Sequence, residues 1–181
     1  MMRHLPLLPM LVAPALMVAA PAAAQLAPGA AAPDFTTQGA LGGEEFTLHL
    51  AARLRQGPVV LYFFPAAFTP GCNAEAAAFA AAVDDFKAAG ASVIGMSADG
   101  VEQLKPFSVQ HCSSKFPVAS ATPAIMRGYA VASDRQYQGR SITSRTSYVI
   151  GRDGKIKYAL TDSNPARHVA GTLAAVRALG N

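Results

Sequence analysis

The sequence predicts an α/β fold in which a central mixed β-sheet is flanked by helices, with a β-hairpin at the N-terminal end. Residues 58–64 form a continuous run of apolar, β-branched and aromatic residues, which is typical of a strand buried on both faces. The next segment, 73–89, repeats apolar residues at helical spacing. Strand-like and helix-like segments then alternate to the end of the chain, an order typical of a layered α/β domain.

The first predicted elements lie on either side of the buried strand. Two segments rich in threonine and phenylalanine, 35–37 and 46–48, flank a glycine-rich turn and predict the hairpin. Within 73–89, phenylalanine and valine recur at i, i+4 and i+7, alanine fills most other positions, and a glycine follows as a stop signal. A helix over 73–89 therefore follows the buried strand directly.

The second half of the chain continues the alternation. Residues 91–97 predict a strand and 99–113 a helix, in which Asp99 is the expected N-cap and Pro106 causes either a kink or a later start. A short strand, a helical turn, two strands joined by an Asp-Gly turn and an amphipathic helix follow at 117–120, Thr122-Pro123, 146–150, 156–160 and 165–179. A final hairpin and helix after a β-α-β unit is the thioredoxin-like arrangement.

Residues 1–24 have the pattern of a secretory signal peptide. A basic start precedes a proline-broken apolar run, and the small residues 22–24 offer an Ala-x-Ala type of cleavage site. The alternatives are an uncleaved anchor and a mis-assigned start codon. Cleavage after Ala24 would leave 157 residues, of which 25–32 predict a flexible linker and 33–181 a single domain. We expect a periplasmic or secreted protein that does not contact the membrane after cleavage.

Composition and charge exclude several classes of function. The 15 basic and 11 acidic residues give a small net charge of +4 without a basic patch, which disfavours nucleic-acid binding. Two cysteines are too few for a disulfide scaffold, and a domain of this size does not need one. The sequence contains neither a cluster of metal-ligand residues nor a phosphate-binding loop, so we expect no metal and no cofactor.

The strongest chemical signal follows the buried strand, at Cys72. This residue lies in the expected first turn of a helix, where unpaired backbone N–H groups and the positive end of the helix dipole favour a thiolate. The hydroxyl of Thr69, three residues earlier, could donate a hydrogen bond to the thiolate or to a bound oxygen. Pro65 and Pro70 stiffen the loop and can keep water away from the sulfur. Glu75 either braces the helix start or is an ordinary first-turn carboxylate.

These residues resemble the active-site motif of the peroxiredoxins, the AhpC/TSA group of the thioredoxin-like superfamily. The motif P-x-x-x-T-x-x-C is matched at each fixed position by Pro65, Thr69 and Cys72. The wider string resembles the branch called peroxiredoxin Q or bacterioferritin comigratory protein. The resemblance extends over nearly the whole mature chain, through residues 32–35, 62–64, 93–99, 145–150 and 153–156.

The resemblance implies a thiol peroxidase that reduces hydrogen peroxide and organic hydroperoxides. Cys72 would be the peroxidatic cysteine, Thr69 would hydrogen-bond the peroxide, and Pro65 would shield the pocket. The active-site arginine of the family maps onto Arg145, although Arg140 and Arg127 compete for that role. The implied partners are a thioredoxin-like protein or a small thiol as reductant, and this branch resembles monomers more often than rings.

Cys112 is the second cysteine, and its role is open. The residue five positions after Cys72, where members of this branch often carry a resolving cysteine, is Ala77. Other members place the resolving cysteine on a later helix, in the region of Cys112. We therefore expect Cys112 to form an intramolecular disulfide with Cys72. The alternatives are a buried cysteine without a redox role and a static disulfide.

Three other functions fit the same predicted fold less well. A thioredoxin-like thiol–disulfide exchanger needs C-x-x-C, but the residue three positions after Cys72 is Glu75. A copper carrier needs C-x-x-x-C, but Ala76 occupies that position. A stress holdase, which binds without turnover, requires no particular motif.

Overall fold

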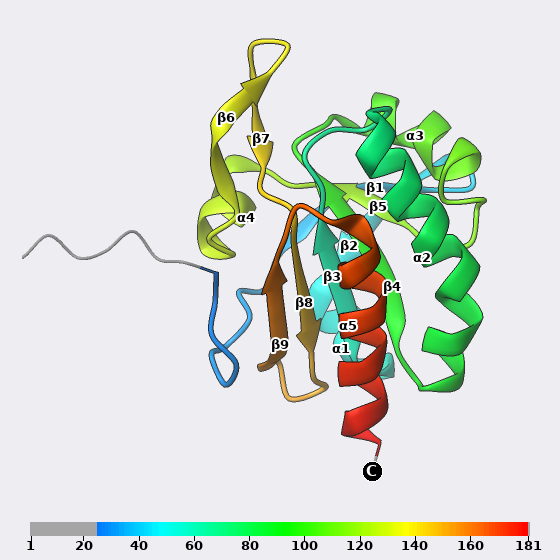
Figure 1. Ribbon diagram of the computed structural model, residues 1–181, viewed down its shortest axis with the longest axis vertical. Helices are drawn as coiled ribbons and strands as arrows, with labels where there is room; N and C mark the ends of the chain where they lie inside the picture. The colour runs from blue at the N-terminus through cyan, green and yellow to red at the C-terminus, as the bar shows by residue number, and fades with distance from the viewer. Residues whose placement is uncertain (1–24, 181) are drawn as a thin grey trace, which may run out of the picture.

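A seven-stranded mixed β-sheet forms the centre of the protein, and helices cover both of its faces (Figure 1). The computed structural model describes residues 25–180, so the predicted signal peptide lies outside the described residues. The strands of the sheet, in spatial order, are β2 (Glu44–His49), β1 (Thr36–Leu41), β5 (Val118–Ser120), β4 (Ser92–Ser97), β3 (Val59–Phe63), β8 (Thr146–Ile150) and β9 (Ile156–Thr161). This arrangement is thioredoxin-like, as predicted, and includes the expected N-terminal hairpin β1–β2.

The helices lie on the two faces according to their apolar residues. On one face, α2 (Pro70–Ala88), α3 (Val101–Gln110) and α5 (Pro165–Leu179) cover a core that contains both cysteines. On the other face, α1 (Leu50–Gln56) and α4 (Pro123–Gly128) cover a second core. In the described part of the chain, no helix has the length and hydropathy that crossing a bilayer requires.

The central strand β3 determines where the site can form. All five of its residues are buried, as the unbroken apolar run predicted. The strand pairs in parallel with β4 and antiparallel with β8, and its last residue, Phe63, lies opposite Met96 and Thr146. Because β8 runs in the opposite direction, it begins where β3 ends. The chain that leaves β3 therefore meets the chain that enters β8.

Two elements are absent from the sequence prediction. Helix α1 has only seven residues and buries only Leu50 and Leu54, which is too little for a periodic signal. The hairpin of β6 (Ala132–Tyr137) and β7 (Arg140–Thr143) projects beyond the central sheet (Figure 1). Strand β6 is mostly exposed and β7 is exposed at two of its four residues, so they lack the alternation of apolar and polar residues by which strands are recognised.

Three boundaries differ from the prediction. Helix α2 begins at Pro70, because proline is well suited to the first helical position. Helix α3 begins at Val101 after Gly100, continues through Pro106 and ends at Gln110, so Asp99 is not its N-cap. The segment predicted to be a flexible linker, 25–32, instead forms backbone hydrogen bonds with the β8–β9 turn, among them Ala32 N–H to Gly154 O at 2.8 Å. In the structure these residues are part of the folded domain.

Candidate active site

Cys72 lies in the first turn of α2, directly after the loop that leaves β3. Its side chain is 1% exposed, and Thr69 is the N-cap residue of the helix. Phe68, just before the cap, has a left-handed backbone with φ of 63°, which turns the chain sharply into the helix. The thiol therefore lies at the positive end of a 19-residue helix, as the sequence predicted.

Arg145 is the residue that brings a charge to this thiol. It precedes β8, and its Nη2 lies 3.5 Å from Cys72 Sγ. The other terminal nitrogen, Nη1, forms an ion pair with Glu75, one helical turn after Cys72. Arg145 thus bridges two residues of α2, and it is the arginine selected from the sequence. Its competitor Arg140 instead pairs with Asp99, with Nη2 at 3.1 Å from Oδ1.

Glu75 is fully buried, which gives it a defined role beyond that of a first-turn carboxylate. Its Oε2 accepts from Arg145, while its Oε1 has no hydrogen-bond partner among residues 25–180. Burial raises the pKa of Glu75 to about 7, although Arg145 acts in the opposite direction. Burial opposes the charge on Arg145, but Glu75 and Cys72 raise its pKa above the ordinary value. Glu75 is therefore a positioning residue for the guanidinium.

Thr69 and Pro65 line the space in front of the sulfur. The Thr69 hydroxyl donates to the carbonyl oxygen of Ala66 at 2.9 Å, so the hydroxyl oxygen is left as an acceptor toward that space. The sequence predicted that this hydroxyl donates to the sulfur or to a bound oxygen. In the structure it donates its hydrogen bond to the Ala66 carbonyl oxygen instead. A hydroperoxide O–H group could donate to the Thr69 oxygen.

A network centred on Asp99 holds the loop before Cys72. The carboxylate is 3% exposed and accepts from Ala67 N–H at 2.7 Å and from Ser97 Oγ at 2.9 Å, both through Oδ2. Its Oδ1 pairs with Arg140 at the start of β7. Asp99 therefore ties the active-site loop to the β6–β7 hairpin, a role that its predicted position at a helix N-cap did not suggest.

Cys72 opens into a cavity of about 230 Å³ between the active-site loop and the β6–β7 hairpin. The hairpin contributes one wall, although the sequence analysis did not predict it. Ala66 lines the cavity, whereas Phe68 packs against Phe107 and His111 outside it. The lining residues are Pro65, Ala66, Thr69, Gly71, Cys72, Arg135, Gln136, Tyr137, Ile142 and Arg145.

Comparison with known proteins agrees with this geometry. The AhpC/TSA family matches residues 28–159, which include the loop, Cys72 and Arg145. The chain belongs to the AhpC/TSA family. It is a peroxiredoxin, and peroxiredoxins are thiol peroxidases.

Individual relatives place it near the peroxiredoxin Q branch. A chloroplastic peroxiredoxin Q of Oryza sativa subsp. japonica is 30% identical over 152 residues, covering 83% of this chain and 67% of the relative. Peroxiredoxin Bcp of Escherichia coli is 29% identical over 112 residues, covering 61% and 72%. The crystal structure of peroxidoxin BcpB from Mycobacterium tuberculosis is 30% identical with a TM-score of 0.74, covering 84% of this chain and 97% of that chain.

Cys112 lies two residues beyond the end of α3, in the turn that follows the helix and not on the helix itself. Its side chain is fully buried in the same apolar core as Cys72, and both thiols are free. Burial raises the pKa of Cys112 to about 12. The two residues after it, Ser113 and Ser114, both have left-handed backbones, with φ of 51° and 55°.

Tyr62 is a further buried residue of the apolar core that contains both cysteines. Its hydroxyl is buried and has no hydrogen-bond partner among the described residues. The pKa of Tyr62 is raised well above its ordinary value by burial first, and then by the charges that Cys112, Glu75 and Cys72 would carry. Sequence reasoning missed this tyrosine because, within an apolar strand, it has the pattern of an ordinary core residue.

Proposed function

We propose that this peroxiredoxin reduces hydrogen peroxide and organic hydroperoxides with Cys72 as the peroxidatic cysteine. The observation that carries the proposal is the Arg145 guanidinium, 3.5 Å from Cys72 Sγ at the edge of a cavity that Pro65 and Thr69 also line. The same site holds a cation where negative charge develops and an acceptor for the peroxide hydrogen. A relative of 27% identity, the bacterioferritin comigratory protein of Xanthomonas campestris, is described as having alkyl peroxide reduction activity, which supports organic substrates.

The first step oxidises the sulfur by two electrons. The Cys72 thiolate attacks one peroxide oxygen, an S–O bond forms as the O–O bond breaks, and the leaving oxygen takes a proton to become water or an alcohol. The product on the enzyme is a sulfenic acid. The Arg145 guanidinium stabilises the negative charge as it moves from the sulfur to the leaving oxygen.

In the second step, Cys112 acts as the resolving cysteine. Its sulfur attacks the sulfenic sulfur of Cys72, a disulfide forms, and the hydroxyl group leaves with a proton as water. A disulfide requires Cα atoms to approach to about 4.4–6.8 Å, so both segments must open locally. The common apolar core, the end of α3 two residues before Cys112, and the left-handed Ser113 and Ser114 support such opening. A thioredoxin-like protein or a small thiol then reduces the disulfide.

A three-protein comparison tests both steps. Wild type, Cys72→Ser and Cys112→Ser are given one equivalent of hydrogen peroxide, and their thiols are mapped by mass spectrometry. Wild type should form a Cys72–Cys112 disulfide, Cys112→Ser should stop at the sulfenic acid, and Cys72→Ser should consume no peroxide. Equal consumption by wild type and Cys72→Ser would overturn the role of Cys72. A stable sulfenic acid in wild type, with Cys112 still reduced, would overturn resolution by Cys112 alone.

The remaining parts of the proposal concern location and assembly. We propose export to the periplasm or the cell exterior, which the signal-like pattern of residues 1–24 supports. Cell fractionation with mass spectrometry of the mature N-terminus tests it, and an intact Met1 in the cytoplasm would contradict it. The monomer also stays a prediction, to be measured by light scattering in both redox states.

A further inference from the structure

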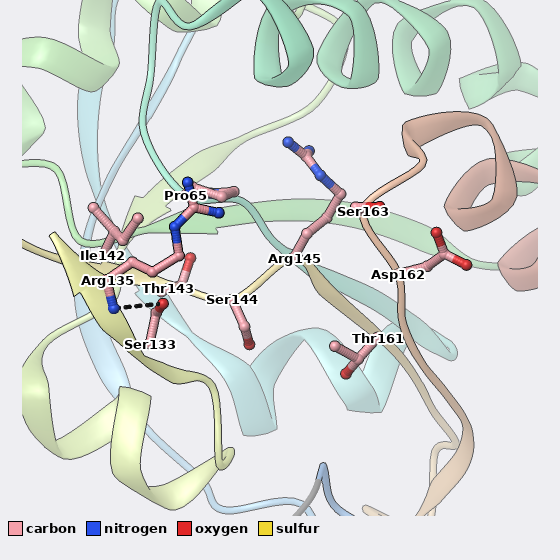
Figure 2. A pocket seen from close by; sticks show the side chains of 10 residues that line it. All are labelled: Pro65, Ser133, Arg135, Ile142, Thr143, Ser144, Arg145, Thr161, Asp162 and Ser163. Carbon is pink, nitrogen blue, oxygen red and sulfur yellow. Dashed lines mark hydrogen bonds between the residues drawn. The ribbon is translucent and has the colours of Figure 1, made fainter. Parts of the chain in front are cut away.

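A second cavity, of about 390 Å³, adjoins the cavity of Cys72. Four residues line both cavities: Pro65, Arg135, Ile142 and Arg145. The second cavity extends from this common wall toward the end of β9 and the loop before α5, as Figure 2 shows. A substrate whose reactive end lies at Cys72 therefore has room to extend past the wall. Hydrogen peroxide would leave the second cavity unused.

The charges around the two cavities are paired, with one exception. The Arg145 guanidinium is paired with Glu75. The carboxylate of Asp162 pairs through Oδ2 with Arg167 and accepts through Oδ1 from Asn164 N–H at 2.8 Å. Arg135 has no carboxylate within ion-pair distance among residues 25–180. The lining thus carries one uncompensated positive charge.

Arg135 lies at the junction of the cavities. Its backbone N–H donates to Ser133 Oγ at 3.1 Å, and Figure 2 shows its side chain extending toward Pro65. Hydroxyl groups line the second cavity beyond this point. Thr143 donates to the carbonyl oxygen of Phe64, and Ser144 shares a hydrogen bond with Thr146, but no hydrogen bond within 25–180 involves the Ser163 hydroxyl. An anion placed here would meet the guanidinium of Arg135 and the Ser163 hydroxyl, which can donate.

We propose that the two cavities form one substrate site, in which Arg135 binds the carboxylate of an organic hydroperoxide. The preferred substrates are then hydroperoxides that carry a carboxylate, with their O–O bond at Cys72. This proposal rests on the peroxidase function proposed above, and it adds the class of substrate. A purely hydrocarbon substrate would leave the Arg135 guanidinium and the Ser163 hydroxyl without a partner, and Pro65 and Ile142 are the two apolar side chains that it would meet in the second cavity.

The test compares two probes of nearly equal shape and different charge. Cumene hydroperoxide with a para carboxylate and the same molecule with a para carboxamide are reduced by wild type, Arg135→Gln and Arg55→Gln. Arg55 is exposed and lies near the start of β3, at the opposite end of the strand from Cys72, so its variant removes the same charge away from the site. Rates of Cys72 oxidation are measured by stopped flow, separately from the recycling step.

Wild type should oxidise faster with the carboxylate than with the carboxamide, and Arg135→Gln should reduce that preference by about tenfold. Arg55→Gln should keep the preference for the carboxylate. Added salt should weaken the preference of wild type less than the Arg135 substitution does. Equal rates for the two probes in wild type, with hydrogen peroxide still reduced, would overturn this inference alone. An Arg135→Gln effect confined to the recycling step would also overturn it, since the carboxylate would then belong to a small-thiol reductant. Failure to reduce any peroxide would overturn the proposed function itself.

Discussion

The two cysteines occupy the same apolar core and are equally hidden, yet their surroundings differ. Cys72 is 1% exposed and Cys112 is fully buried. Cys72 lies at a helix start, 3.5 Å from a guanidinium and beside a cavity. Cys112 lies beyond a helix end, where burial alone raises its pKa to about 12. Burial therefore does not distinguish the two thiols, whereas the charge and the open space beside Cys72 do.

The largest expected difference is in alkylation. In the native protein at neutral pH, iodoacetamide should modify Cys72 faster than Cys112 by about a thousandfold or more, because the thiolate is the nucleophile and burial suppresses it at Cys112. Timed quenching and peptide mass spectrometry measure both rates in one sample. In denaturant, the two rates should converge to within a few fold. Similar rates in the native protein would show that the surroundings of the two thiols do not separate them.

Removal of the guanidinium should have the next largest effect. Arg145→Gln is expected to lower the second-order rate constant with hydrogen peroxide by about a hundredfold, since one preorganised donor to the developing charge is lost. Stopped-flow fluorescence or competition with another peroxidase measures it. Arg145→Lys should not restore the rate, because an ammonium cannot place two separate nitrogens on Cys72 and Glu75.

Arg127→Gln is the matched control for that substitution. Arg127 lies in α4, on the opposite face of the sheet from α2, and its loss should leave the rate unchanged. An equal decrease in both variants would indicate a general effect of net charge.

Glu75 should make the peroxide rate, relative to the Cys72 alkylation rate, change by about tenfold with pH. Burial raises its pKa to about 7, so protonation below that pH removes its ion pair with Arg145. The ratio of the peroxide rate to the Cys72 alkylation rate should rise between about pH 6 and pH 8 in wild type and stay flat in Glu75→Gln. The ratio cancels the fraction of thiolate. An identical profile in the variant would exclude Glu75 as the cause.

The contribution of Glu75 to stability should fall as pH rises, whereas the rate ratio rises. Between the ordinary value of 4.5 and about 7, the folded protein holds a proton on Glu75 that the unfolded chain has lost. The contribution of Glu75 to the free energy of unfolding therefore falls as pH rises through this window, and Glu75→Gln should lack that decrease. Urea unfolding at several pH values measures it.

The smallest effect is expected from the network behind the active-site loop. Asp99→Asn should lower the peroxide rate by about threefold and speed hydrogen exchange at the Ala67 amide, because the charged acceptor at 2.7 Å is replaced by a neutral one. Hydrogen-exchange mass spectrometry of the loop detects the second change. Protection in the segment around Cys112 should not change, and a loss of protection there would mean that Asp99 supports the fold as a whole.

The site residues that lie close together in the chain were predictable from the sequence. The buried strand, the helix start and the motif residues Pro65, Thr69 and Cys72 are contiguous, so periodicity and spacing were enough to place them. Arg145 was placed through the resemblance to a family and lies where that resemblance implied. The fold followed in the same way, since its core strands carry long apolar runs.

What the sequence did not predict depends on partners that are distant in the chain. Glu75 had no distinguishing local pattern, and its role follows from Arg145, 70 residues later. Asp99 fitted a helix N-cap by its position, but the amide of Ala67 and the guanidinium of Arg140 compete for its carboxylate and fix it elsewhere. The β6–β7 hairpin is polar and exposed, and its importance lies in the cavity wall it provides.

The antiparallel pairing of β3 and β8 also determines when Cys72 acquires its charged surroundings during folding. Cys72 and Arg145 are 73 residues apart in the chain, and this strand pairing brings their segments together. Contacts across such separations close large loops and are expected to form after local helices and hairpins. A partly folded chain thus holds two ordinary thiols, and the charged environment of Cys72 arises with one of the last long-range contacts. We therefore expect peroxide reactivity at Cys72 to be a late event of folding, so that the rate of peroxide consumption would be a kinetic probe of this pairing.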